Sequence, residues 1–145
     1  MPKISLASDC VTIAAVAPVS IGAGSSSLTG WISVAGFKRL KFSLLVGTIT
    51  STGVVNFSIN QATSSTGAGS KALAGAAITA ITVSNGVAEI SINGDALDTN
   101  NGFAYVQAVP IVTTAAAVLG FLAQGEPTAT PPTNPAIVVQ SIYLP

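Results

Sequence analysis

The clearest feature of the sequence is the recurrence of apolar residues at every second position over short stretches. In residues 39–46, RLKFSLLV, and again in residues 54–60, VVNFSIN, apolar side chains occupy every second position. Because successive side chains of a strand point to opposite faces, each stretch predicts a strand with one buried face. The core residues predicted on these faces are Leu40, Phe42, Leu44, Val55, Phe57 and Ile59. No stretch of eleven or more residues has the 3.6-residue apolar stripe of an amphipathic helix.

Similar runs rich in Val, Ile, Thr and Phe follow one another along the chain, separated by Gly, Ser and Asn. The expected strands are residues 10–16, 31–34, 39–46, 54–60, 77–84, 87–93, 103–109, 111–123 and 136–144, with Pro110 dividing two of them. Residues 50–53, TSTG, and the dipeptide Asn85-Gly86 suit hairpin turns, and residues 61–70 form a small polar stretch that we expect to be a mobile loop. Eight to nine strands without helices predict an all-β protein, an antiparallel β-sandwich of either the simple or the jelly-roll kind.

The chain length of 145 residues suits one domain. We expect residues 1–125 to form the β-sandwich core and residues 126–135, EPTATPPTNP, to form an extended Pro/Thr-rich linker. Residues 136–145 then hold a C-terminal strand, AIVVQSIYL, which is too apolar to remain in water. It would pack on its own subunit or on a neighbouring one.

Charge is scarce in this chain. Charged residues make up 7% of the sequence and the formal net charge is zero, which argues against a nucleic-acid partner. Mean hydropathy is +0.68, but the longest apolar runs, residues 72–83 and 111–123, are too short to span a membrane as helices. A protein with so few charges tends to self-associate, so we expect a homo-oligomer, a trimer or a dimer.

The residue inventory argues against catalysis. The chain has no histidine and five carboxylates, so the commonest acid–base residue is absent and paired carboxylates are few. Cys10 is the single cysteine and would be a buried strand residue. We predict no catalytic residue, no metal and no cofactor, and therefore no enzyme.

Two further groups of residues have a structural interpretation beside a functional one. Residues 93–102, NGDALDTNNG, gather oxygen ligands of the kind that calcium prefers, but their spacing does not match an EF-hand loop. We interpret them as a turn. Trp31, Tyr105 and Tyr143 could form an aromatic platform for a sugar, although Trp31 at a strand start is more typical of a core or interface residue.

Three of the five basic residues, Lys38, Arg39 and Lys41, lie within four positions. On the strand predicted over 39–46, Arg39 and Lys41 share the exposed face and Lys38 lies near its start. Cations on an exposed edge strand discourage edge-to-edge pairing, and a basic patch can also dock on an acidic partner. The two roles are compatible, and we favour docking, which makes Lys38, Arg39 and Lys41 the predicted partner-binding residues.

Several segments resemble small structural proteins encoded among the head genes of tailed bacteriophages. They are GWISVAGFKRLKFSLLVGTIT, VNFSINQATSSTGAGSKALAG, FAYVQAVPIVTTAAAVLGFLAQGEP and the closing IYLP. This resemblance implies a β-sandwich decoration, or cement, protein that sits on the outer surface of a bacteriophage capsid, with the major capsid protein as its partner and the virion as its location. The proline-rich segment before the last strand departs from the pattern, and no site residue carries over.

Three functions follow from these observations. The favoured one is a non-enzymatic structural virion protein that binds and stabilises the outside of a capsid, with neither nucleic acid nor membrane as a partner. The alternative is a carbohydrate- or receptor-binding β-sandwich module of a phage tail or a secreted protein. A third is another assembly-forming β protein, such as a surface-layer or fimbrial subunit.

Overall fold

The computed structural model describes residues 10–25 and 27–128. The strands in these ranges are β1 (Val11–Ile21), β2 (Gly24–Ser25), β3 (Ile32–Ser33), β4 (Phe37–Ile49), β5 (Val54–Ala62), β6 (Lys71–Ile81), β7 (Gly86–Asn93), β8 (Tyr105–Thr113) and β9 (Ala117–Pro127). Two short 3-10 segments, η1 (Gly94–Ala96) and η2 (Thr99–Asn101), lie between β7 and β8. No helix in the described ranges has the length and apolarity needed to cross a membrane.

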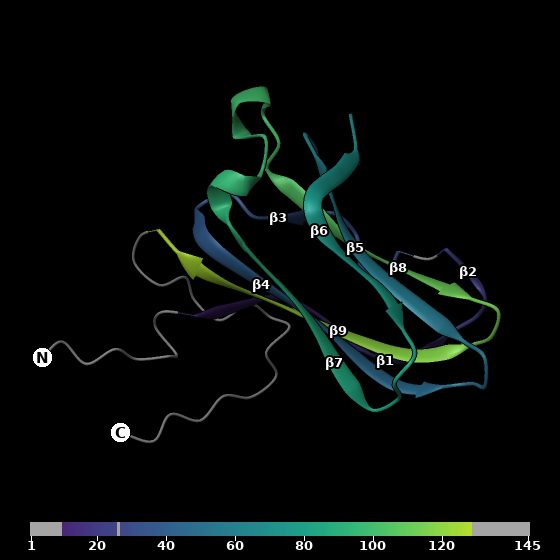
Figure 1. Cartoon of the computed structure of the whole chain (residues 1–145). Helices are drawn as coiled ribbons and strands as arrows, with labels where there is room; N and C mark the ends of the chain where they lie inside the picture. The colour runs from purple at the N-terminus through teal and green to yellow at the C-terminus, as the bar shows by residue number, and fades with distance from the viewer. Residues whose placement is uncertain (1–9, 26, 129–145) are drawn as a thin grey trace, which may run out of the picture.

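The strands form two sheets that pack face to face (Figure 1). One sheet has the order β1-β9-β4-β7, and we call it the β4 sheet. The other has the order β2-β8-β5-β6, with β3 also paired to β8, and we call it the β5 sheet. Every pairing is antiparallel. The predicted all-β antiparallel sandwich is therefore confirmed.

The connectivity is that of a jelly roll. β2 and β3 both lie along β8, β2 beside Ile111 and Val112 and β3 beside Tyr105 and Val106, so together they act as one interrupted strand. With these two joined, the chain changes sheet at every connection except the one from β5 to β6. This arrangement of eight strands in two four-stranded layers defines the jelly roll.

The two predicted hairpins between neighbouring strands are wrong. Asn85-Gly86 and the TSTG turn carry the chain from one sheet to the other, because β6 pairs with β5 and β7 pairs with β4. Asn85 still adopts the left-handed backbone expected of a turn residue (φ 60°), and its N–H donates to the Gly47 carbonyl oxygen at 3.0 Å. A turn is therefore present at Asn85 as predicted. The strands that it joins belong to different sheets, so their apolar faces meet across the core and the strands do not pair side by side.

Pro110 does not end a strand as predicted. β8 runs through it, and the break before β9 comes at residues 114–116, where Thr114 has a φ of 73°. Beside Pro110, β8 has a continuous partner in β5, whereas on its other side the pairings with β3 and β2 leave residues 107–110 between them. A residue without an N–H is tolerated where a ladder is interrupted.

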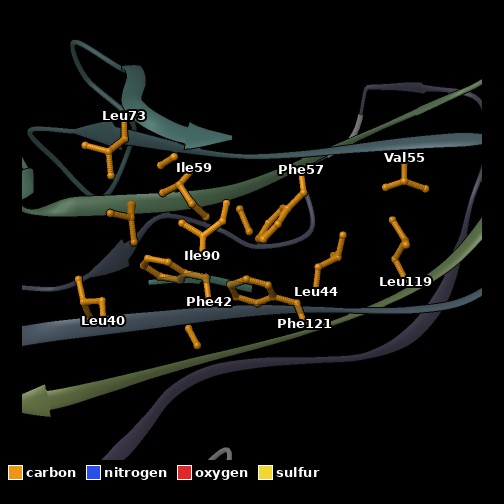
Figure 2. Close-up of a cluster of buried hydrophobic side chains, with 14 of the residues drawn as sticks. Leu40, Phe42, Leu44, Val55, Phe57, Ile59, Leu73, Ile90, Leu119 and Phe121 are labelled. Carbon is orange, nitrogen blue, oxygen red and sulfur yellow. The ribbon is translucent and has the colours of Figure 1, made fainter. Parts of the chain in front are cut away.

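The predicted core is confirmed. Leu40, Phe42 and Leu44 from β4 and Val55, Phe57 and Ile59 from β5 are at most 2% exposed. Figure 2 shows these side chains pointing toward one another from the two sheets, with Leu119 and Phe121 of β9 among them. Phe121 stacks on Phe42 and meets Phe57 edge to face, with both ring centroids 6.3 Å away.

β9 extends through Pro127, which pairs with Phe37, and the Thr128 N–H donates to the Gly36 carbonyl oxygen at 2.8 Å. The sheet thus includes the first residues of the segment expected to be a linker. The rest of that segment and the expected strand over 136–144 lie outside the described residues.

Candidate partner-binding surface

Arg39 and Lys41 lie on the outer face of β4. This strand pairs with β7 on one side and with β9 on the other, so it is an interior strand of its sheet. The hypothesis that these cations guard a strand edge is therefore wrong. Both side chains are nevertheless open to solvent, with exposed fractions of 71% for Arg39 and 45% for Lys41.

Each of these two cations has an acidic partner on a neighbouring strand. Arg39 pairs with Glu126 of β9 through its Nε, and the Lys41 Nζ lies 2.8 Å from an oxygen of Glu89 on β7. The hydrogen bond from Arg39 lowers the pKa of Glu126, and the charges of Arg39 and Lys38 lower it further. The same hydrogen bond raises the pKa of Arg39. Two of the three predicted cations are thus neutralised by their neighbours.

Lys38 differs from the other two. It is exposed, and within the described residues it takes part in no ion pair. The predicted cluster therefore combines one unpaired lysine with two ion pairs. Its surface alternates in charge, which suits a partner with a mixed pattern better than a purely acidic one.

A shallow hollow of about 410 Å³ lies over this charged part of the sheet. The polar side chains that line it include Arg39, Lys41, Ser91, Asn93, Gln124 and Glu126. The half-buried Cys10 also lines the hollow. Glu126 is the carboxylate among the residues that line the hollow. The chain has no histidine that could act beside it as an acid or a base.

The other half of the same face is apolar. Leu45 of β4 is 42% exposed and Val87 of β7 beside it is 57% exposed. On the opposite side of Leu45 lies Gly120, at which a Cβ would fall 3.4 Å from the Pro18 ring of β1. The half-buried Leu122 is the next residue of β9 on the same outer face. We call Leu45, Val87, Leu122, Gly120 and Pro18 the apolar patch.

Sequence reasoning missed the apolar patch, although one signal could have found it. Leu44 and Leu45 are adjacent in a strand, so one of them must point away from the core. Leu44 is fully buried, and Leu45 takes the exposed face. The outer face of the β4 sheet therefore changes along its strands from ion pairs near Arg39 to apolar side chains near Leu45.

The loop over residues 93–102 fits its interpretation as a structural turn. Asp98 binds the Lys71 ammonium at 2.6 Å through one oxygen and accepts from the Asn101 amide at 2.8 Å through the other. These contacts, with that to Lys71 the largest, lower the pKa of Asp98. The Asp98 N–H also donates to the buried Gln61 side chain at 3.0 Å. Among the residues described, no group of three His, Cys, Asp or Glu side chains could hold a metal ion.

Trp31 packs within the domain. Its indole lies against Gly67 in the loop between β5 and β6, so closely that a Cβ at Gly67 would fall 2.4 Å from the indole nitrogen. That loop is further held by Ser64, whose hydroxyl accepts from the Thr66 and Ala68 N–H groups. The Trp31 ring is thus used in an internal contact, and Tyr143 of the suggested aromatic platform lies outside the described residues.

No known family model and no curated protein sequence matches the chain. Among solved structures, a chain in the crystal structure of the T13 particle of infectious bursal disease virus matches it with a TM-score of 0.50 and 13% identity, over 84% of this chain and 32% of that one. The protein shares its fold with a virus-particle chain. Structures of the Gt strain of that virus and of its VP2 subviral particle match with TM-scores of 0.46 and 13% identity, covering 84% and 82% of this chain. The chain spans about a third of the length of each.

Proposed function

We propose that this protein is a non-enzymatic structural component of a virion, a decoration or cement protein bound to the outer surface of a bacteriophage capsid. Its partners are the major capsid protein and further copies of itself. Nucleic acid and membrane are not among its partners. The bacteriophage assignment comes from the sequence resemblance, and the jelly-roll fold is consistent with a role in a virus particle.

The apolar patch carries this proposal. Leu45 lies on the interior strand β4 and Val87 on the neighbouring strand β7, and both expose apolar surface to water. A protein that functions alone would be more soluble with polar residues at these two positions. Contiguous exposed apolar surface with a polar rim is typical of a protein–protein interface. The neighbouring ion pairs of Arg39 and Lys41 provide that rim.

The predicted docking residues take a defined place in this arrangement. In this proposal Arg39 and Lys41 flank the apolar patch on the outer face and Lys38 lies exposed near the start of β4, so that the apolar side chains supply affinity and the charges fix orientation. Lys38 offers the unpaired positive charge that would meet a carboxylate of the capsid protein. Sedimentation of the purified protein is expected to show a dimer or trimer, because a chain with so few charged residues tends to self-associate.

Quantitative mass spectrometry of purified particles tests the proposal. The protein is expected at a fixed, many-copy ratio to the major capsid protein, and intact particles should bind an antibody raised against the folded domain. Its absence from particles, or its presence only after disruption of the shell, would overturn the proposal.

A second candidate, the carbohydrate- or receptor-binding module, is favoured by one observation. The hollow of about 410 Å³ has the size of a small-ligand site, and it offers the polar side chains of Ser91, Asn93 and Gln124 beside the two ion pairs. Specific binding on a glycan array that Gln124→Ala abolishes would support this function, and absence of binding would remove it.

A further inference from the structure

A second apolar surface lies where the two sheets part, between the edges of β6 and β7. It is a groove of about 450 Å³ whose apolar lining includes Ile78 and Ile81 of β6 and Val87 and Ala88 of β7. Val83, in the connection between these strands, also lines it and is 71% exposed. Val83 and Val87 are the two most exposed large apolar residues of the described chain.

The core is incompletely covered on this side. Ile78, Ile81, Ala88 and Ile92 pack against the buried cluster but remain only partly buried. β7 pairs with β4 and has no second strand partner within residues 10–128. Its outer edge therefore presents backbone N–H and C=O groups next to an apolar groove, which is the combination that an added strand requires.

A segment of suitable chemistry follows the described part of the chain. Residues 136–144, AIVVQSIYL, carry no charge and contain five aliphatic residues of the Ile, Val and Leu type. Such a run needs apolar surface to cover. The Val- and Ile-rich composition is also typical of a strand.

The same molecule can deliver this segment to the groove. The described chain ends at Thr128, bonded to Gly36, at the end of the β4 sheet where Arg39 pairs with Asn93, the last residue of β7. From β9, a position beyond β7 is three strand spacings away, about 14 Å. Residues 129–135 would span about 22 Å in an extended proline-type conformation, so the connection is long enough.

The direction of the chain also favours this edge. β7 runs toward the end of the sheet where Thr128 lies, and β1 runs away from it. A strand starting near Thr128 would be antiparallel to β7 but parallel to β1. Antiparallel pairing is the slightly more stable of the two, and it continues the pattern of all the strand pairings within residues 10–128.

We propose that residues 136–144 of the same molecule lie in this groove as a strand antiparallel to β7. The added strand completes the core between Ile78 and Ala88 and removes the free edge of the β4 sheet. The apolar patch on the outer face remains available. This inference is independent of capsid binding and is tested on the isolated protein.

Disulfide trapping provides the test. In a Cys10→Ser background, Val87→Cys is combined in turn with a cysteine at each of positions 139 to 143, and the proteins are oxidised at low concentration. We expect disulfides within one molecule either at positions 139, 141 and 143 or at positions 140 and 142, because side chains of a strand alternate between faces. Ala15→Cys on the exposed outer face of β1, combined with the same set, is the matched control and should give no cross-link.

Two results would overturn the proposal. One is the absence of cross-links at all five positions. The other is a set of disulfide-linked dimers only, which would assign the groove to a second copy. Hydrogen exchange on the full-length chain gives an independent check: N–H groups of β7 that point away from β4 should exchange slowly, and fast exchange there would contradict the proposal.

Discussion

The ring of Phe57 in the β5 sheet meets the ring of Phe121 in the β4 sheet edge to face, with centroids 6.3 Å apart. This contact joins the two layers at the centre of the core. Both side chains are at most 1% exposed. Aromatic pairs of this geometry stabilise a core beyond the area that they bury.

Phe57→Ala should therefore lower the free energy of unfolding by about 3–5 kcal/mol, through lost burial and a residual cavity. Chemical denaturation of both proteins measures this difference. Thr48→Ala, at an exposed position of β4, is the control and should change stability by less than about 0.5 kcal/mol. A loss below about 1 kcal/mol for Phe57→Ala would mean that the two sheets do not pack as described.

Gly67→Ala should disturb the site of Trp31. Gly67 has a φ of 82°, and its Cβ would clash with the indole. Gly69→Ala is a matched control in the same loop, because Gly69 also has a positive φ of 63° but its Cβ would meet only Thr63 Oγ1 at 3.9 Å. Trp31 is the single tryptophan, so its fluorescence reports directly. We expect the emission maximum of Trp31 to shift to longer wavelength in Gly67→Ala but not in Gly69→Ala. Equal emission spectra for the two variants would refute the contact between Gly67 and the Trp31 indole.

Stability should be flat between about pH 5 and 7 and fall below about pH 4. The chain has no histidine to titrate in the upper range. The pKa values of Asp98 and Glu126 are lowered in the folded protein by Lys71 and Arg39 respectively. The unfolded chain therefore binds more protons than the folded one as pH falls through the ordinary carboxyl range, which favours unfolding.

Denaturation at a series of pH values measures this profile. Glu126→Gln should reduce the acid sensitivity, because it removes a carboxyl whose pKa is lowered in the folded protein. Thr48→Ala, which changes no titratable group, serves as the control and should leave the profile unchanged. A stability change centred between pH 5 and 7 would be inconsistent with this explanation.

The docking role of the cations can be separated from their ion pairs. Lys38→Gln should weaken binding to particles with little change in the melting temperature, because Lys38 is exposed and takes part in no ion pair within the described residues. The exchange Arg39→Glu with Glu126→Arg keeps the ion pair but reverses the charge pattern, and it should weaken binding as well. If particle binding survives both changes, these residues do not dock the partner.

The fold class and the core could be predicted because alternation is a local property. In β4 and β5 the apolar residues at every second position show which face of the strand is buried. This pattern predicts that Phe42 and Phe57 point to the interior. The partners of each strand could not be predicted in the same way. Asn85-Gly86 specifies a turn, and its sequence does not state whether the next strand returns to the same sheet or crosses to the other.

The candidate surface was predicted in part for the same reason. The alternation placed Arg39 and Lys41 on an outer face, as found. Their neutralisation could not be foreseen, because Glu126 lies 87 residues from Arg39 in sequence and meets it only through the register of β9 on β4. The apolar patch likewise depends on Gly120 and Val87 being brought beside Leu45 by two different strand pairings.

We propose that the outer face of the β4 sheet attaches this protein to a capsid. The most direct measurement is co-sedimentation of the purified protein with capsid shells that lack it, comparing the native protein with a Leu45→Asp, Val87→Asp variant of unchanged melting temperature. We expect saturable binding of the native protein at a fixed ratio to the capsid protein and at least a tenfold weaker affinity for the variant, about 1.4 kcal/mol or more. Equal binding of the two proteins, or no binding of the native protein to the shells, would contradict it.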